Sequence, residues 1–124
     1  MSADGSEEAI YIASVLTLYA DLPDTPVRPS PMDQSMARKL HKEAVPLPLV
    51  ESALLLGTCR RLARTSDLPP LPRIRSLAYF LPVIAELQQQ PLPFGYLQYL
   101  RLKLQRLPMA SRPDAQKSTF LHDR

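Results

Sequence analysis

The chain of 124 residues is poor in glycine and cysteine and contains no tryptophan. Its three glycines, Gly5, Gly57 and Gly95, are too few and too far apart to form a dinucleotide-binding fingerprint or a phosphate-cradling P-loop. The single cysteine, Cys59, excludes an intramolecular disulfide and favours a reducing compartment. These absences remove the common cofactor-binding motifs, and we expect no cofactor.

Long apolar runs and an export signal are also missing. No apolar stretch reaches the roughly 18 residues of a membrane-spanning helix. Asp4, Glu7 and Glu8 stand near the N-terminus, where a secretory signal would carry positive charge. The sequence therefore predicts a cytoplasmic protein that does not enter a membrane.

Residues that perform catalysis or bind metals are scarce. His41, His122 and Cys59 do not have metal-ligand spacing. Cys59 and His41 could be paired as nucleophile and base, but both fall on predicted helices, and a cysteine on an apolar surface is normally inert. Glu43 and Glu51 are more typical of solvated surface acids. We predict that the protein is not an enzyme and has no catalytic, cofactor-binding or metal-binding residue.

Fourteen prolines divide the chain into short segments. They are dense in residues 22–31, expected to be extended and partly polyproline II, and in the loop 65–73. The sequence predicts an all-α fold, a small bundle of about five helices with proline-rich connections. We expect a disordered N-terminus (1–5), a helical bundle domain (6–107) and a flexible tail (108–124).

The first two helices have recognisable start signals. Ser6 can cap the first helix, whose core-facing residues would be Ile10, Ser14, Val15, Leu18 and Leu22, with Tyr11 and Tyr19 at the edges. Ser30, Pro31 and Asp33 form a capping-box pattern that starts the second. Its inward residues would be Met32, Met36, Ala37 and Leu40, and its outward residues Arg38, Lys39, Lys42 and Glu43.

The third helix is predicted from about Pro48 to Arg64, after the break Val45-Pro46-Leu47-Pro48. Its broad apolar surface is typical of the central helix of a bundle: Val50, Ala53, Leu54 and Leu62, widened by Leu55, Leu56 and Cys59. Gly57 in mid-helix indicates a close helix crossing.

The fourth helix, capped by Ser76, contains Pro82 and ends in a glutamine run, Gln88 to Gln90. Pro82 predicts either a kink or a short lead-in turn followed by a helix that restarts at Pro82.

The last helix carries a leucine seam at Leu97, Leu100, Leu104 and Leu107, which we expect to dock on the third helix. A second line runs beside it: Tyr96, Tyr99, Lys103 and Arg106. These side chains could stack on bases and neutralise phosphates, or they could form the rim of the bundle.

Charge is unevenly distributed along the chain. Residues 1–59 have a net charge of −4 and residues 60–112 a net charge of +7. Eight of the nine basic residues in the second stretch are arginines, whose planar guanidinium group suits phosphate. A solvated helix face is the alternative interpretation.

One family resemblance can be stated from these motifs. They are Ser30-Pro31-x-Asp33, the helix Leu49-Val50-Glu51-x-Ala53-Leu54, the basic loop after it, and Ile74-x-Ser76-Leu77-x-Tyr79. In this order, over residues 19–90, the chain resembles the C-terminal domain of the DnaD-like replication-initiation proteins. The resemblance implies an all-helical module of bacterial type that binds DNA or a replication partner. The family's DNA-binding pattern, Y-x-x-x-I-x-x-x-W, corresponds here to Tyr79, Val83 and Leu87.

Two functions follow as hypotheses. The first is a non-enzymatic DNA-binding accessory protein, of replication or of a mobile element, that contacts phosphates. Its nucleic-acid-binding residues would be Arg60, Arg61, Arg64, Arg73, Arg75, Tyr79, Tyr96, Tyr99, Lys103 and Arg106. The second is a helical protein-interaction module that uses Leu68, Leu71 and Leu92 and the proline-rich loops. Arginines gathered on one face would favour the first hypothesis, and scattered arginines the second.

Overall fold

Prolines mark the starts of three helices in this chain. The computed structural model describes residues 2–64, 68–69, 71–93 and 95–106. Its elements are the α-helices α1 (Ser2–Ala20), α2 (Pro31–Lys42), α3 (Leu47–Leu62), α4 (Leu81–Gln89) and α5 (Tyr96–Arg106) and the 3-10 helix η1 (Leu77–Phe80). The described residues include no β-strand, and the predicted all-α bundle is confirmed.

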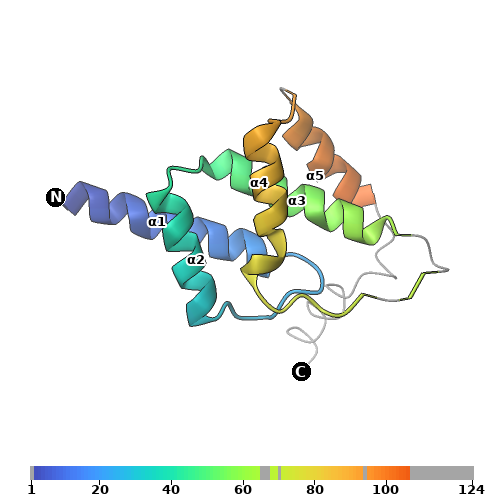
Figure 1. Cartoon of the computed structure of the whole chain (residues 1–124), viewed down its shortest axis with the longest axis horizontal. Helices are drawn as coiled ribbons and strands as arrows, with labels where there is room; N and C mark the ends of the chain where they lie inside the picture. Colours follow the sequence, from blue (N-terminus) through green and yellow to red (C-terminus); the bar gives the residue numbers. More distant parts are fainter. Residues whose placement is uncertain (1, 65–67, 70, 94, 107–124) are drawn as a thin grey trace.

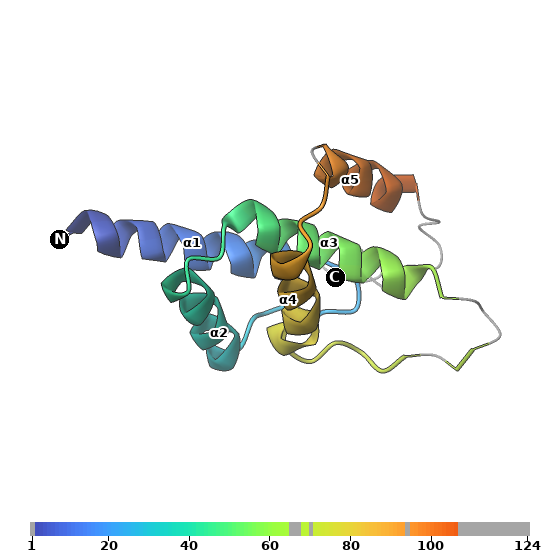
Figure 2. The ribbon, with the colours of Figure 1, turned by 45° about the horizontal axis from the view of Figure 1, so that its top comes forward.

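The helix α3 lies at the centre of the bundle. It packs against α1, η1, α4 and α5, while α2 packs against α1 and η1. Figure 1 shows α4 crossing α3, and Figure 2 shows α4 and α5 on opposite sides of α3. In both views the N-terminal turns of α1 extend beyond the other helices. The predicted central position of the third helix is confirmed.

The core-facing side predicted for α1 is confirmed at Val15, Leu18 and Leu22 and differs from the prediction at Ile10 and at the tyrosines. Tyr11, Val15 and Tyr19 follow one another at four-residue steps, and the last two are completely buried. The hydroxyl of Tyr11 donates a hydrogen bond to the carbonyl oxygen of Val45 (2.7 Å), and burial raises the pKa of Tyr11 to about 12. Ile10, predicted to face the core, is 65% exposed.

The start of α1 also differs from the prediction. The helix begins at Ser2, so residues 2–5, predicted to be disordered, have helical backbone. Ser6 therefore lies inside the helix and is not its N-cap. Glu7 and Glu8 consequently lie beyond the first turn of the helix, where the interaction with the helix dipole is weak.

The segment between α1 and α2 is irregular, as predicted, but its first half is not extended. Residues 21–25 form turns, with Asp24 in the left-handed region at φ 67°. Thr25 is fully buried, and its hydroxyl donates a hydrogen bond to the carbonyl oxygen of Leu22 (2.7 Å). The loop is therefore part of the packed core.

The capping box at the start of α2 is confirmed. The hydroxyl of Ser30 accepts from the N–H of Asp33 (3.2 Å), and Oδ2 of Asp33 accepts from the N–H of Ser30 (2.8 Å). Asp33 is also buried, and its Oδ1 accepts from the N–H of Leu77 at the start of η1 (2.9 Å). One carboxylate thus joins the beginnings of two helices.

The predicted faces of α2 are confirmed except at one residue. Ala37 and Leu40 are buried and Met36 is half-buried. Met32 is exposed, because it is Asp33 that turns inward in the first turn. The four residues expected to face outward are exposed: Arg38, Lys39, Lys42 and Glu43.

The helix α3 begins at Leu47, one residue before the predicted start. Its fully buried apolar residues are Val50, Ala53 and Leu54. A Cβ placed on Gly57 would stand 2.9 Å from Cδ1 of Phe80. The close approach predicted from Gly57 is therefore confirmed, and the partner is the ring of Phe80.

Pro82 separates two helical segments. The hydroxyl of Ser76 caps η1 by accepting from the N–H of Ala78 (3.2 Å). The helix α4 then starts at Leu81, so Pro82 occupies its second position, where no intrahelical hydrogen bond is lost. Of the two predicted alternatives, the lead-in turn followed by a restarted helix is correct, and α4 ends at Gln89 within the glutamine run.

The helix α5 docks on α3, as the leucine seam predicted. Leu100 is buried, and Leu97 and Leu104 are half-buried. Leu107, the last residue of the seam and of the predicted domain, and the predicted tail 108–124 lie outside the described residues. Within the described part of the chain, none of the helices is both long enough and apolar enough to cross a bilayer.

We expect Asp33→Ala to destabilise the protein more than Ser30→Ala. The serine substitution removes one capping hydrogen bond, at a cost of about 1 kcal/mol. The aspartate substitution also leaves the buried N–H of Leu77 without an acceptor, which adds roughly 1–3 kcal/mol. Urea unfolding followed by circular dichroism measures both losses. Equal losses would show that the contact between Asp33 and Leu77 does not stabilise the fold.

We expect Gly57→Ala to lower stability, although alanine favours a helix by about 1 kcal/mol. The added methyl group would overlap the ring of Phe80, and such overpacking costs about 1–3 kcal/mol. Phe80→Leu should therefore lower the free energy of unfolding less in the Gly57→Ala variant than in the natural chain. Additive losses in a double-mutant cycle of unfolding free energies would contradict the overlap.

Candidate functional site

Three residues of α3 and one residue just after it are spaced by three, one and three positions, so they lie on the same side: Gly57, Arg60, Arg61 and Arg64. Together with Leu71, Tyr79 and Val83 they line a surface hollow of about 390 Å³, which we call the arginine hollow. The three arginines and Tyr79 were predicted as nucleic-acid-binding residues. The structure brings these four together, from α3 and η1.

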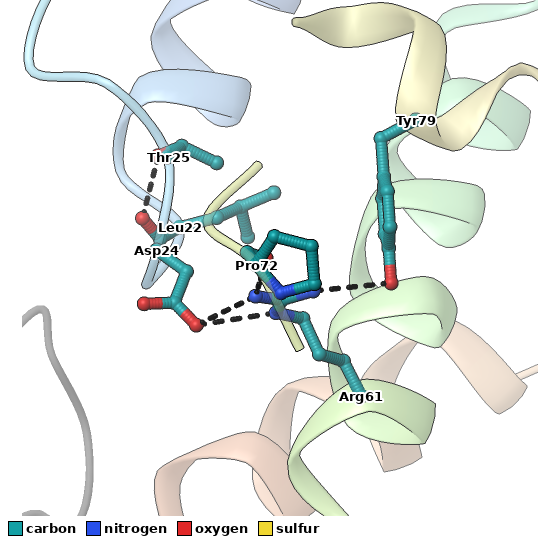
Figure 3. A network of polar contacts seen from close by, with 6 residues as sticks. All are labelled: Leu22, Asp24, Thr25, Arg61, Pro72 and Tyr79. Atoms are coloured by element: carbon teal, nitrogen blue, oxygen red, sulfur yellow. Dashed lines mark hydrogen bonds and ion pairs between the residues drawn. The ribbon is translucent and has the colours of Figure 1, made fainter. Parts of the chain in front are cut away.

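Arg61 is buried inside the fold, where it connects three segments (Figure 3). Its Nη2 and Nε donate to Oδ2 of Asp24 at 3.0 and 3.2 Å, and Nη2 also donates to the carbonyl oxygen of Pro72 (2.6 Å). Its Nη1 lies 3.4 Å from the hydroxyl of Tyr79. Burial lowers the pKa of the guanidinium, but hydrogen bonds to Tyr79 and Asp24 outweigh it and leave this pKa raised. Arg61 therefore serves as an internal cross-link.

Tyr79 is held in a fixed position at the edge of the hollow. Its ring centroid lies 5.5 Å from the guanidinium carbon of Arg61 and 5.1 Å from the ring centroid of Phe80, which it meets edge to face. The side chain is nevertheless 41% exposed. An exposed aromatic ring held in this way can stack on a planar ligand group.

Arg60 makes a two-pronged contact with Glu86 of α4. The Nη1–Oε1 and Nη2–Oε2 distances are 2.8 and 2.7 Å. The hydrogen bonds from Arg60 lower the pKa of Glu86, and the same contact raises the pKa of Arg60. Arg60 is therefore neutralised at the surface of the protein.

Three further predicted arginines, Arg64, Arg73 and Arg75, keep their charge available. Arg64 is exposed and donates from Nη2 to the carbonyl oxygen of Pro69 (2.8 Å), which is a neutral acceptor. Arg73 and Arg75 are exposed, in the segment that continues from Leu71 to η1. Among the residues that the structure describes, no acidic group lies within ion-pair distance of these three arginines. They are the uncompensated positive charges near the hollow.

The aromatic and basic residues predicted on α5 form a second group, outside the hollow. The ring centroids of Tyr96 and Tyr99 lie 5.1 Å apart, and Nζ of Lys103 lies 5.9 Å from the centroid of Tyr99. The side chain of Arg106 lies outside the described part of the chain. The structure thus divides the predicted site residues between the arginine hollow, the adjoining 71–75 segment and α5.

Asp24 and Glu86 are the two functional neighbours that sequence reasoning missed. Each neutralises an arginine of the hollow, although Asp24 is 37 residues from Arg61 and Glu86 is 26 residues from Arg60. The row of arginines could have been found from its spacing alone. Asp24 and Glu86 could not have been found in this way, because no local sequence pattern relates them to the arginines.

Cys59 and His41, which were considered as a nucleophile and base, have different surroundings in the structure. Cys59 is buried, which raises the pKa of its thiol despite the opposing influence of Lys103. His41 instead contacts α1, with its ring centroid 5.0 Å from that of Tyr11 and its Nδ1 3.9 Å from Oε2 of Glu8. No cluster of three or more potential metal ligands occurs among the described residues.

Comparisons with protein-family models, with curated proteins and with solved structures found no match for this chain. The arginine hollow and its surroundings are therefore the features of this chain that indicate a function.

We expect Arg61→Ala to destabilise the protein by about 2–4 kcal/mol, since it leaves Asp24 and the carbonyl of Pro72 without their donor. The loss should fall somewhat below that for a fully buried pair, because the Asp24 side chain is 19% exposed. Arg64→Ala is the matched control and should cost less than about 1 kcal/mol. Similar losses in urea unfolding for both variants would contradict a structural role for Arg61.

Proposed function

We propose that the protein is a non-enzymatic DNA-binding accessory protein that contacts phosphates through its arginine-rich second half. The observation that carries the proposal is the arginine hollow, in which Arg64, without an acidic partner among the described residues, lines the same surface as the exposed ring of Tyr79. Arg73 and Arg75 add charges that are also without an acidic partner in the described part of the chain. Guanidinium groups beside an exposed aromatic ring are the combination that binds a nucleic-acid strand.

Within this proposal the residues have different roles. Arg64, Arg73 and Arg75 contact phosphates, and Tyr79 stacks on a base. Arg61 does not touch the ligand; it positions Tyr79 and holds the 21–25 and 71–75 segments against α3. Tyr96, Tyr99 and Lys103 form a second contact region on α5, which a longer strand could reach.

The proposed binding is weakly sequence-specific and strongly dependent on salt. The helix α3 is packed against α1, η1, α4 and α5, and so it cannot enter a major groove as a recognition helix. Contacts would instead be made mainly to phosphates, whose binding releases counterions.

The DnaD-like resemblance implies a role in replication, and a role in a mobile element is the alternative within the same proposal. Of the three residues matched to the family's DNA-binding pattern, Tyr79 lies on η1, while Val83 and Leu87 lie on α4. Leu87 is buried and Val83 is half-buried, whereas Tyr79 is exposed. Of these three residues, we therefore assign a direct DNA contact to Tyr79 alone.

A second candidate function is a protein-interaction module. Leu71, Tyr79 and Leu81 are exposed apolar residues on the segments that border the hollow, and Arg60 and Arg61 are neutralised by acids of the same chain. Such an apolar surface with arginine and tyrosine at its centre is also typical of a protein interface.

The DNA proposal is tested by fluorescence anisotropy with labelled single-stranded and double-stranded DNA over a salt series. We expect affinity to fall linearly on a log–log plot against salt. Arg64→Ala, Arg73→Ala and Arg75→Ala should each weaken binding and reduce the slope by about one. Tyr79→Ala should weaken binding without changing the slope.

Arg38→Ala provides the control, because Arg38 is an exposed arginine of α2 that does not line the hollow. It removes the same charge and should change affinity less than Arg64→Ala. The DNA proposal fails if the natural chain does not bind at low salt, and the protein-interaction candidate then takes its place.

A further inference from the structure

Of the two ion pairs made by arginines of the hollow, the pair between Arg60 and Glu86 is the one with both partners at the surface. Their side chains are 52% and 43% exposed, whereas Arg61 and Asp24 are 5% and 19% exposed. Exposed ion pairs contribute little to stability. The pair of Arg60 and Glu86 is therefore not needed for the stability of the fold.

The geometry of the pair resembles the binding of an external anion. Two parallel N–H···O hydrogen bonds, at 2.8 and 2.7 Å, join the guanidinium group to both carboxylate oxygens. Arginine binds the oxygens of a phosphate with the same two-pronged arrangement. Glu86 thus occupies the position that a phosphate would take on Arg60, at the edge of a hollow that Arg64 also lines.

We infer that Arg60 is an anion-binding position of the arginine hollow, and that Glu86 is an intramolecular competitor which a nucleic-acid phosphate must displace. The inference rests on the proposed DNA-binding function and adds that Glu86 determines which anions can reach Arg60. Until a strand binds, the carboxylate of Glu86 covers the guanidinium group of Arg60.

This arrangement selects a polymer of phosphates over a single phosphate. Glu86 is tethered next to Arg60, so its effective concentration there is in the millimolar range or above. Inorganic phosphate or a mononucleotide must compete with it from free solution. A strand that is already anchored at Arg64 presents its neighbouring phosphate to Arg60 at a similarly high effective concentration. The competitor is charged at neutral pH, as an ordinary glutamate is, and the hydrogen bonds from Arg60 lower the pKa of Glu86 further.

The chain contains a matched control for the charge change. Glu51 of α3 accepts two hydrogen bonds at Oε2 from Arg101 of α5, at 2.7 and 3.2 Å. Neither residue lines the arginine hollow. Glu51→Gln and Glu86→Gln therefore change the net charge of the protein equally, but only the second releases Arg60.

The test compares the full chain with E86Q, E51Q, R60A and the double variant E86Q/R60A. Binding of a labelled DNA oligonucleotide is followed by anisotropy over a salt series. We expect E86Q to tighten binding roughly three- to tenfold at low salt and to steepen the salt slope by about one, for one additional phosphate contact. E51Q should tighten binding less and leave the slope unchanged. R60A should weaken binding little in the natural chain and should abolish the gain of E86Q.

Inorganic phosphate and a mononucleotide are used as competitors in the same assay. After correction for the DNA affinity of each variant, a lower concentration of these competitors should displace DNA from E86Q than from E51Q. Circular dichroism and urea unfolding verify that all variants are folded.

The outcomes separate the inference from the proposed function. DNA binding by the natural chain with equal effects of E86Q and E51Q would overturn the inference and leave the proposed function intact. A gain in E86Q that persists in E86Q/R60A would also overturn it, because Arg60 would not be the released group. Absence of DNA binding by both the natural chain and E86Q would overturn the two together.

Discussion

The buried carboxylate of Asp33 holds together a chain that its prolines divide into short helices. Its two oxygens accept hydrogen bonds from Ser30 and from Leu77, so the start of α2 and the start of η1 are fixed to the same group. Each N–H would otherwise be an unsatisfied donor at a helix N-terminus. Because η1 carries Tyr79 and Phe80, the contact made by Asp33 also determines where the edge of the arginine hollow lies.

The three arginines at the end of α3 show how neighbouring positions of one row acquire different roles. Arg61 is buried and joins the 21–25 and 71–75 segments to α3. Arg64 is exposed and donates only to a neutral carbonyl group in the described part of the chain, whereas Arg60 is covered by Glu86. A net charge of +7 over residues 60–112 therefore overstates the charge that this surface presents. The placement of acids from other elements decides what the row can bind.

Features that depend on local sequence could be predicted, and features that depend on distant partners could not. The capping box at Ser30 and the restart of the helix at Pro82 follow from residues within a few positions of each other. The second hydrogen bond of Asp33 and the burial of Arg61 depend on partners 44 and 37 residues away. Of the core-facing residues predicted for the first helix, Val15 and Leu22 were predicted correctly, but periodicity did not distinguish the buried Tyr19 from the exposed Ile10. Of the predicted site residues, Arg60, Arg61, Arg64 and Tyr79 line the arginine hollow, but the neutralisation of Arg60 and Arg61 was not predicted.

The position of α5 at the edge of the bundle has a consequence for how the protein opens. This helix packs chiefly on α3, after a connection that contains Pro91 and Pro93, whereas α3 itself is enclosed by several elements. Opening of α5 exposes Leu100 and breaks the pair between Arg101 and Glu51, but it leaves the joint at Asp33 and the contacts of Arg61 in place. Detachment of the last helix is therefore a partial unfolding step of lower free energy than loss of the whole fold. The last helix, α5, can therefore separate from the bundle while the other helices keep the arginine hollow intact.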